Sequence, residues 1–520
     1  MTALAAAHSE LSNFHAPHID WKAMSPLVAV LGGSVIVLIA GILPGRRLQR
    51  VLPAALAIVA LLAAIGLTIW IWEPGHTKTI VAGALSVDTL ALGLSTLFYV
   101  AGIATVLLSL RSAVMRETGS GEYASLLLGS IGGMVLLAGA ENLVTLFIGI
   151  ELLSIPLYIL CGSRVRDGAS LEAGLKYLIV GSVGSATLLF GLAFMYGATG
   201  STDLSRIAGA IGGAVPLTDP LLLTGIALVA TGLAFKASIA PFHQWTPDAY
   251  QGAPTPVTSF MAVATKAAAF AILLRFFDHG VLRAHDDWAP ALAALAVTTI
   301  LIGNAGAIAQ RSMKRMLAWS GVAQAGYMLA GVVVGTRLGV QATAFYLAVY
   351  LLMNVAAFAV VIARERVSER GDDIRALEGL GRSSPWLAWP MTIAMLALAG
   401  IPATSGFIGK FYLIDASVSG DYAWLGVVIV VGSMMSLAYY LRVLAVMWMA
   451  PREVELTLPY RRGRRVRPVA GWSPEADARA QPEVTAVAVV AAAATVVLGI
   501  VPQPLFHLAQ DVGSSLAGLM

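Results

Sequence analysis

Two lysines lie within apolar runs in the middle of the chain, where leucine would be the ordinary residue. Lys236 lies near the end of LLLTGIALVATGLAFKASIA, and Lys266 lies near the middle of VTSFMAVATKAAAFAILL. A charged side chain at the centre of a lipid bilayer costs roughly 2.5–3.5 kcal/mol on insertion scales. Lysine is also a side chain whose pKa moves readily on burial. The two positions therefore predict a proton-carrying role rather than a packing role.

Three further titratable residues interrupt apolar runs and are candidates for the same chemistry. Glu151 lies in LFIGIELLSIPLYIL, where it either carries a proton, pairs with a lysine (Lys236 is the expected partner) or hydrogen-bonds a neighbouring helix. Lys176 lies close to a membrane end, so its ammonium can also reach the interface as an ordinary surface lysine. His243 follows Pro241, where a helix should break, and its imidazole suits either a proton relay or the capping of freed carbonyls.

A second interrupted run, MLALAGIPATSGFIGKFYLI, contains Pro402 between Gly400 and Gly406, with Lys410 shortly after the second glycine. Broken helices in corresponding places of two halves indicate a transporter site near the middle of the membrane. The breaks at Pro241 and Pro402 fall in the seventh and twelfth apolar runs. A five-helix unit that is repeated once must be inverted, because five is odd. The pattern therefore predicts two inverted five-helix repeats with discontinuous helices 7 and 12.

The remaining polar residues carry no further site. Asp88 and Asp248 lie close to membrane ends, and we interpret both as interfacial anchors. The eight histidines are scattered without metal-ligand spacing, so a metal site is not expected. No glycine-rich phosphate loop or haem motif is present, and no cofactor is expected in this chain.

The composition indicates an all-α polytopic membrane protein. Hydrophobic residues make up 58% of the 520 residues and charged residues only 12%, compared with about 25% in soluble domains. Apolar runs long enough to cross a bilayer number fourteen, at 26–43, 53–72, 87–109, 123–140, 143–161, 173–197, 221–239, 256–277, 289–309, 316–335, 341–363, 386–413, 423–449 and 484–505.

The lysines and arginines between these runs fix the expected orientation. One set of alternate connections holds 22 of them and the other holds five. Cytoplasmic connections carry the excess of positive charge, so both termini are expected outside the cytoplasm. The longest connection, 451–483, is basic and is expected to contact lipid headgroups or a neighbouring subunit. Nucleic acid is not an expected partner.

These boundaries divide the chain into five expected parts. They are residues 1–122 with helices 1–3, 123–280 with the first repeat (helices 4–8), 281–450 with the second repeat (helices 9–13), 451–483 with the basic cytoplasmic loop, and 484–520 with helix 14.

The chain resembles the antiporter-like membrane subunits of respiratory complex I, the NADH-quinone oxidoreductase, and among them the subunit N group. Three runs carry the resemblance: GIELLSIPLYIL, LAFKASIAPFHQWTPDAYQGAPTPVTSFMAVATKAAAFAILLR and GLGRSSPWLAWPMTIAMLALAGIPATSGFIGKFYL. The residues that match the family's proton-transfer axis are Glu151, Lys236, Lys266 and Lys410, with Lys176 and His243 at further polar positions of that axis. Subunit M of this family usually has glutamate where Lys410 stands.

The resemblance implies a proton-translocating subunit of the complex I membrane arm, in the bacterial plasma membrane with both termini periplasmic. NADH, flavin, iron–sulfur clusters and quinone are expected on partner subunits. The expected partners are other membrane-arm subunits, the lipid bilayer and protons. Multi-subunit Na+/H+ antiporters share most of these motifs and remain the alternative. A non-transporting scaffold is disfavoured by the lysines within the apolar runs.

Overall fold

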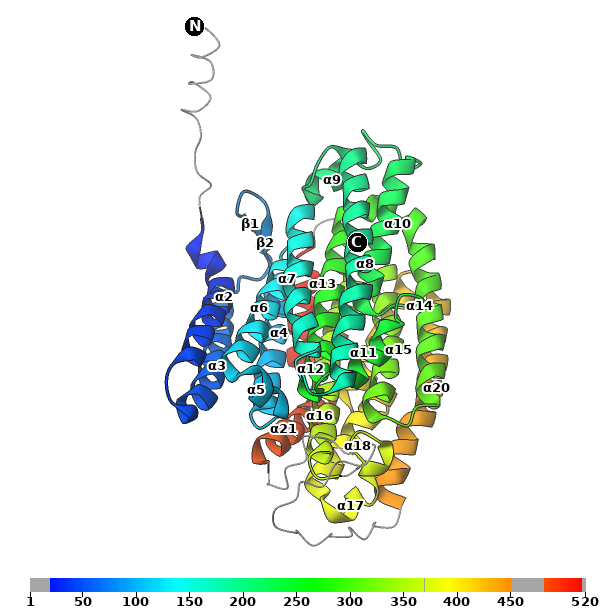
Figure 1. Ribbon diagram of the computed structural model, residues 1–520. Coiled ribbons are helices and arrows are strands. Elements are labelled where there is room, and N and C mark those ends of the chain that lie inside the picture. The colour runs from blue at the N-terminus through cyan, green and yellow to red at the C-terminus, as the bar shows by residue number, and fades with distance from the viewer. Residues whose placement is uncertain (1–18, 369, 450–480, 517–520) are drawn as a thin grey trace.

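The computed structural model describes residues 19–368, 370–449 and 481–516 (Figure 1). Most of the expected basic loop 451–483 lies outside the described residues. Thirteen helices in the described part are long and apolar enough to cross a membrane, and the remaining expected span is divided between two shorter helices. The prediction of a polytopic helical membrane protein is therefore confirmed, and α18 with α19 occupies the place of the remaining expected span.

The helices fall into two halves of the chain. In the first they are α2 (Trp21–Ile42), α3 (Arg46–Trp70), α4 (Thr89–Ser109), α5 (Ala113–Thr118), α6 (Ser120–Ala138), α7 (Leu143–Cys161), α8 (Gly168–Thr199), α9 (Leu204–Ala210), α10 (Pro220–Ala237), α11 (Trp245–Gly252), α12 (Thr255–Phe260), the π-helical η1 (Met261–Thr265), α13 (Lys266–Arg275) and the π-helical η2 (Phe276–Gly280). In the second they are the 3-10 helix η3 (Leu282–Ala284), α14 (His285–Ile308), α15 (Met313–Val333), α16 (Arg337–Glu365), the 3-10 helix η4 (Ile374–Leu377), α17 (Leu380–Ser383), α18 (Pro385–Ala399), α19 (Ser405–Ser419), α20 (Ala423–Met449), α21 (Pro482–Ile500) and α22 (Gln503–Gly513).

Both predicted helix breaks are present. Helix α10 ends at Ala237, its C-cap Ser238 has a left-handed conformation with φ of 63°, and the chain resumes as α11. Both segments pack against α8, so together they form one discontinuous span. Helix α18 likewise ends at Ala399, with Gly400 as its C-cap at φ of 85°, and α19 continues the span. The last helical residue lies four positions before Pro241 in α10 and three positions before Pro402 in α18, because proline lacks an N–H donor and its ring clashes with the carbonyl four residues earlier in a helix.

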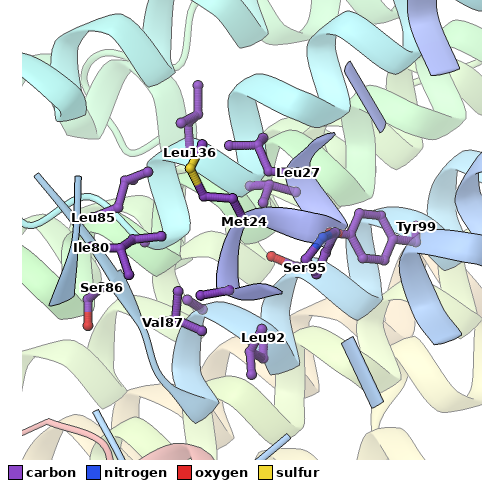
Figure 2. A pocket seen from close by; sticks show the side chains of 15 residues that line it. Met24, Leu27, Ile80, Leu85, Ser86, Val87, Leu92, Ser95, Tyr99 and Leu136 are labelled. Atoms are coloured by element: carbon purple, nitrogen blue, oxygen red, sulfur yellow. The ribbon is translucent and has the colours of Figure 1, made fainter. Parts of the chain in front are cut away.

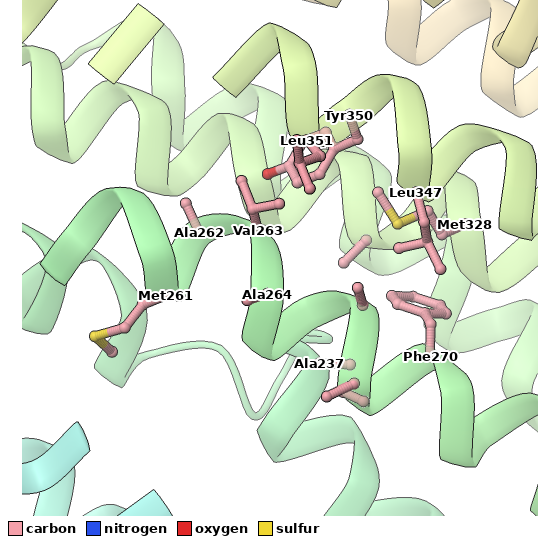
Figure 3. Packing of buried hydrophobic residues seen from close by; sticks show 14 of the residues in the cluster. Ala237, Met261, Ala262, Val263, Ala264, Phe270, Met328, Leu347, Tyr350 and Leu351 are labelled. Carbon is pink, nitrogen blue, oxygen red and sulfur yellow. The ribbon is translucent and has the colours of Figure 1, made fainter. Parts of the chain in front are cut away.

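The centre of the molecule is the eighth span, which runs from α12 to η2. Its apolar window is buried along its whole length, whereas only 28% of the window in α2 and 33% of that in α3 is buried. Figure 3 shows side chains of η1 and α13 meeting Leu347 and Tyr350 from α16 and Met328 from α15. The outer helices expose apolar side chains, as expected for helices that face lipid or a neighbouring subunit.

One short hairpin departs from the all-helical expectation. Strands β1 (Lys78–Ile80) and β2 (Leu85–Val87) pair antiparallel in the connection between α3 and α4. The hairpin is fixed to the turn between α6 and α7, because the backbone N–H of Ser86 donates to the carbonyl of Gly139 at 2.7 Å. In Figure 1 the hairpin lies near one end of the helices, on the side of α9, and α5 and α17 lie at the other end.

Candidate functional site

Lys236 lies in the last turn of α10 and is 3% exposed. Its Nζ donates to the hydroxyl of Ser154 at 2.7 Å and to that of Tyr177 at 2.9 Å. The ring of Tyr177 stacks on Trp245, the first residue of α11, so the helix break also fixes the lysine's partner. The ammonium therefore meets two neutral oxygen atoms.

Glu151 does not make the contact expected of it. It lies on α7 one turn before Ser154, and its Oε1 has no hydrogen-bond partner. In the described residues no ion pair joins it to Lys236. One face of α7 is exposed and carries Ile148 and Ile155. Glu151 is half-buried and lies at the edge of this face. Ser154 therefore occupies the place beside the ammonium, and charge coupling between Glu151 and Lys236 across a longer distance remains a prediction.

Lys266 and Lys410 both cap a broken helix. Lys266 follows η1 directly, is buried, and donates to the carbonyl of Ala237, the last residue of α10, at 3.3 Å. Lys410 on α19 is also buried and donates to the carbonyls of Leu398 and Ala399, the last residues of α18, at 2.8 and 3.1 Å. The last carbonyls of a helix have no partner within it and carry partial negative charge. The breaks therefore supply the acceptors that hold both ammonium groups.

Glycine is required beside Lys410. A Cβ at Gly400 would lie 3.0 Å from the Cδ of Lys410, and the residue has a positive φ that favours glycine. The Lys410 ammonium also lies 4.9 Å from the ring centroid of Tyr327. These contacts fix the lysine against the open end of α18.

The other two expected residues lie in different surroundings. His243 lies in the connection between α10 and α11 with its ring buried against Trp319, and its Nδ1 has no hydrogen-bond partner. Lys176 is 44% exposed and forms ion pairs with Glu172 at 2.7 Å and Asp248 at 3.0 Å. Asp248 also pairs with Arg315. Lys176 thus belongs to a surface ion network, whereas His243 lies near the helix break.

Comparison with known proteins identifies the family. The profile of a family described as "NADH:quinone oxidoreductase/Mrp antiporter, TM" matches residues 140–436. NADH-quinone oxidoreductase subunit N 2 of Roseiflexus castenholzii is 39% identical over 467 residues, which are 88% of this chain and 93% of the relative. Subunit N of Chloroflexus aggregans is 38% identical over 501 residues, 95% and 97% of the two chains. The chain belongs to the subunit N family of NADH-quinone oxidoreductase.

Solved structures agree with this membership. A chain of respiratory complex I from Thermus thermophilus superposes with a TM-score of 0.75 at 32% identity and covers 93% of this chain and 99% of its own length. A chain of the Mrp complex from Dietzia sp. superposes with a TM-score of 0.76 at 22% identity over 96% and 98% of the two chains, which shows a shared fold.

A buried ion cluster in this subunit N chain was missed by sequence reasoning. Arg275, at the end of α13, donates to both carboxylate oxygens of Asp88 at 2.8 and 3.0 Å. It also donates to Glu141 at 3.3 Å, and His279 and Ser205 hydrogen-bond the other oxygen of Glu141. Asp88 is 1% exposed, so its interpretation as an interfacial anchor is wrong. The sequence did contain one indication of the cluster, because Arg275 is a charged residue inside the expected span 256–277 and not in a loop between spans.

The cluster holds its charges fixed. Burial raises the pKa of Glu141, but the hydrogen bond from His279 and the charge of Arg275 outweigh burial and lower the pKa to about 2. Arg275 keeps its proton under all ordinary conditions. The cluster therefore differs from the lysines, whose partners are uncharged.

One pocket lies away from the lysines and borders the ion cluster, because Ser86 lines it and donates to Asp88 at 2.8 Å. It is bounded by α2, the β1–β2 hairpin, α4 and α6, and its lining is mostly apolar, with the ring of Tyr99 at one side (Figure 2). None of the residues expected to carry protons lines it.

Proposed function

We propose that this chain is a proton-translocating membrane-arm subunit of NADH-quinone oxidoreductase. Electron transfer from NADH to quinone takes place in partner subunits, which hold the flavin and iron–sulfur clusters, and this chain moves protons through its buried titratable residues. Membership of the subunit N family supports the assignment to this complex.

The observation that carries the proposal is the kind of partner each buried lysine has. Lys236, Lys266 and Lys410 donate to hydroxyl or carbonyl oxygens, and no ion pair involves them in the described residues. Burial removes the ammonium's hydration, which disfavours the charged form, and dipoles compensate only in part. The charged and neutral forms of such a lysine stay close in free energy, so a nearby change in charge can release or return the proton. A full counter-ion, as Arg275 has, would fix the charge instead.

The order of the lysines suggests lateral transfer. Lys266 donates to the carbonyl of Ala237, which is the residue directly after Lys236. The surroundings of the two lysines are therefore adjacent. Glu151 is the acidic residue on the neighbouring helix, one turn from the partner of Lys236. We assign it the role of the charge that biases Lys236. His243 is assigned to the same route, and Lys176 to its surface end.

The two expected repeats are part of the proposal. In residues 123–280, α6 packs on α7 and α8 packs on the broken span of α10 and α11. In residues 281–450, α14 packs on α15 and α16 packs on the broken span of α18 and α19. The same order of contacts in both halves supports two copies of one five-helix unit. The charge asymmetry of the connections supports a periplasmic position for both termini in the plasma membrane.

The multi-subunit Na+/H+ antiporter is the weaker alternative. The Mrp chain shares the fold at 22% identity, whereas the relatives at 38–39% identity are subunits N of NADH-quinone oxidoreductase.

The deciding experiment is purification of the intact complex through a tag on this chain, followed by reconstitution into liposomes. Flavin and iron–sulfur absorption should accompany the chain, and NADH with quinone should generate a pH gradient that an uncoupler abolishes. A complex of membrane subunits alone, which exchanges Na+ for protons without NADH, would replace this function with the antiporter.

A further inference from the structure

Gln324 and Lys410 share one acceptor. Gln324 lies in the middle of α15 and is fully buried, and its Nε2 is 3.3 Å from the carbonyl oxygen of Leu398. The Nζ of Lys410 donates to the same oxygen at 2.8 Å. A carbonyl oxygen has two lone pairs and can accept both bonds. A neutral amide and a titratable ammonium thus share one oxygen at the open end of α18, and the stronger donor weakens the hydrogen bond of the other.

Tyrosines fix the rest of the Gln324 amide. The hydroxyl of Tyr346 donates to its Oε1, and the hydroxyl of Tyr440 lies 3.3 Å from its Nε2. Tyr440 in turn shares a hydrogen bond with Ser320, one turn earlier on α15. All of these side chains are buried. Any rotation of the amide must therefore disturb a connected set of hydroxyl groups.

The same face of α15 reaches Lys266. Gly321 lies three residues before Gln324, on one face of the helix. A Cβ at Gly321 would lie 3.3 Å from the Cε of Lys266 and 3.0 Å from the hydroxyl of Tyr350. The Tyr350 hydroxyl is buried without a hydrogen-bond partner in the described structure. The surface formed by Ser320, Gly321 and Gln324 therefore links the surroundings of the two lysines.

We propose that Gln324 is a positioning residue that couples the charge of Lys410 to the hydroxyl groups beside Lys266. The inference rests on the proposed proton-translocating function. No proton passes through the amide, which keeps both of its hydrogens throughout. Its role is to respond to the strength of its competitor at Leu398.

The response follows from hydrogen-bond strength. A charged ammonium is a strong donor and dominates the Leu398 carbonyl, as the shorter distance shows. When Lys410 gives up its proton, the neutral amine is a weaker donor and the carbonyl becomes available to Gln324. The amide then turns toward Leu398 and loosens its bonds to Tyr346 and Tyr440. The Tyr440 hydroxyl also bonds Ser320, the residue before Gly321, and the Cβ position of Gly321 faces Lys266, so the change reaches the surroundings of that lysine along α15.

The test uses the intact complex in liposomes, with proton transport measured per NADH oxidised over a range of pH. Gln324→Leu removes the second donor to Leu398 together with the bonds to Tyr346 and Tyr440, and should lower proton transport by about fivefold or more, since one lost buried hydrogen bond accounts for about fivefold. Gln324→Glu keeps the shape but places a carboxylate near the ammonium. It should hold Lys410 charged and shift the pH profile of transport upward by about 1 to 3 pH units.

Gln341→Leu is the matched control. Gln341 lies in the same half, on α16, and its Oε1 accepts from the hydroxyl of Tyr412 at 2.7 Å, but no hydrogen bond in the described structure joins it to a lysine. This variant should transport protons as the wild type does. If Gln324→Leu assembles poorly, the pH profile of Gln324→Glu decides alone.

An unchanged pH profile for Gln324→Glu, or wild-type transport by Gln324→Leu, would overturn the coupling role while leaving the proposed function intact. A wild-type complex that oxidises NADH without transporting protons would instead refute the function on which the inference rests.

Discussion

Arg275 binds both carboxylate oxygens of Asp88 across 187 positions of sequence, with Nη2–O distances of 2.8 and 3.0 Å. Both side chains are buried, and the pair joins the start of α4 to the end of α13. Asp88 also accepts from the backbone N–H of Ala91 as the N-cap of α4. The contact therefore joins the N-terminal helices to the central eighth span.

Asp88→Asn should destabilise the chain strongly, because it leaves a buried arginine with only part of its counter-charge. Removing one partner of a buried ion pair typically costs about 3–5 kcal/mol. The measurement is the thermal unfolding of the purified complex. Lys78→Ala is the control, since the Lys78–Asp20 pair near the hairpin has an exposed lysine and such pairs contribute about 0–1 kcal/mol. Equal stability of the two variants would show that the buried ion cluster contributes no more to the stability of the chain than an exposed ion pair does.

Lys236→Ala should abolish or strongly reduce proton transport while the complex still assembles. Lys236→Arg should not restore transport, because arginine effectively never releases its proton. Lys176→Ala is a useful comparison, since Lys176 lies in an exposed ion network, and we expect it to lose much less activity. Transport is measured as the NADH-driven pH gradient in liposomes. Normal transport by Lys236→Arg would contradict a change of protonation at this site.

Lys410→Glu should be less harmful than Lys410→Leu. The carbonyls of Leu398 and Ala399 need a donor, and a protonated carboxyl group can donate to one of them and still carry a proton, whereas leucine can do neither. The comparison is made on proton transport per NADH oxidised. Equal and complete loss in both variants would assign Lys410 a purely structural positive charge.

Glu151 and Lys236 should act as one unit despite the absence of a direct ion pair. Coulomb interactions persist over several ångströms inside a membrane protein. The variant Glu151→Gln combined with Lys236→Leu should therefore be scarcely worse than either single variant. A double-mutant cycle on proton transport measures this directly. Effects that multiply would mean that Ser154 and Tyr177 alone set the behaviour of Lys236.

A reporter fused after residue 520 should be active in the periplasm, because 22 of the 27 basic residues in the connections and tails are on the opposite side by alternation of the spans. A companion fusion within 452–479 should report the cytoplasm. Cytoplasmic activity of the terminal fusion would mean that one span is missing from the count of fourteen.

Sequence reasoning found the spans and the lysines because both depend on local chemistry. The thirteenth expected span, 423–449, coincides with α20, since hydropathy alone sets the length of a lipid-facing helix. Lys236 and Lys266 were visible because a charge in an apolar run is costly wherever the run packs.

The partners of these lysines could not be found in the same way. Ser154 and Tyr177 are ordinary residues in apolar helices, and they lie 82 and 59 positions from Lys236. Gln324 carries no charge, and its contact with Leu398 spans 74 positions. These groups meet only because their helices pack together. A single sequence does not show which helices are neighbours. Arg275 was overlooked for a different reason, because the span that contains it was judged on its average hydropathy.

The use of main-chain carbonyls as acceptors has a consequence for how the sequence can vary in evolution. The oxygens that hold Lys266 and Lys410 belong to Ala237, Leu398 and Ala399, and every amino acid provides the same oxygen. Substitutions at these three positions leave the acceptor in place, so a screen of single variants would identify the donors and pass over what they bind. Natural selection can therefore preserve these acceptors only through the residues that end the two helices. One of them is Gly400, whose positive φ few other residues adopt.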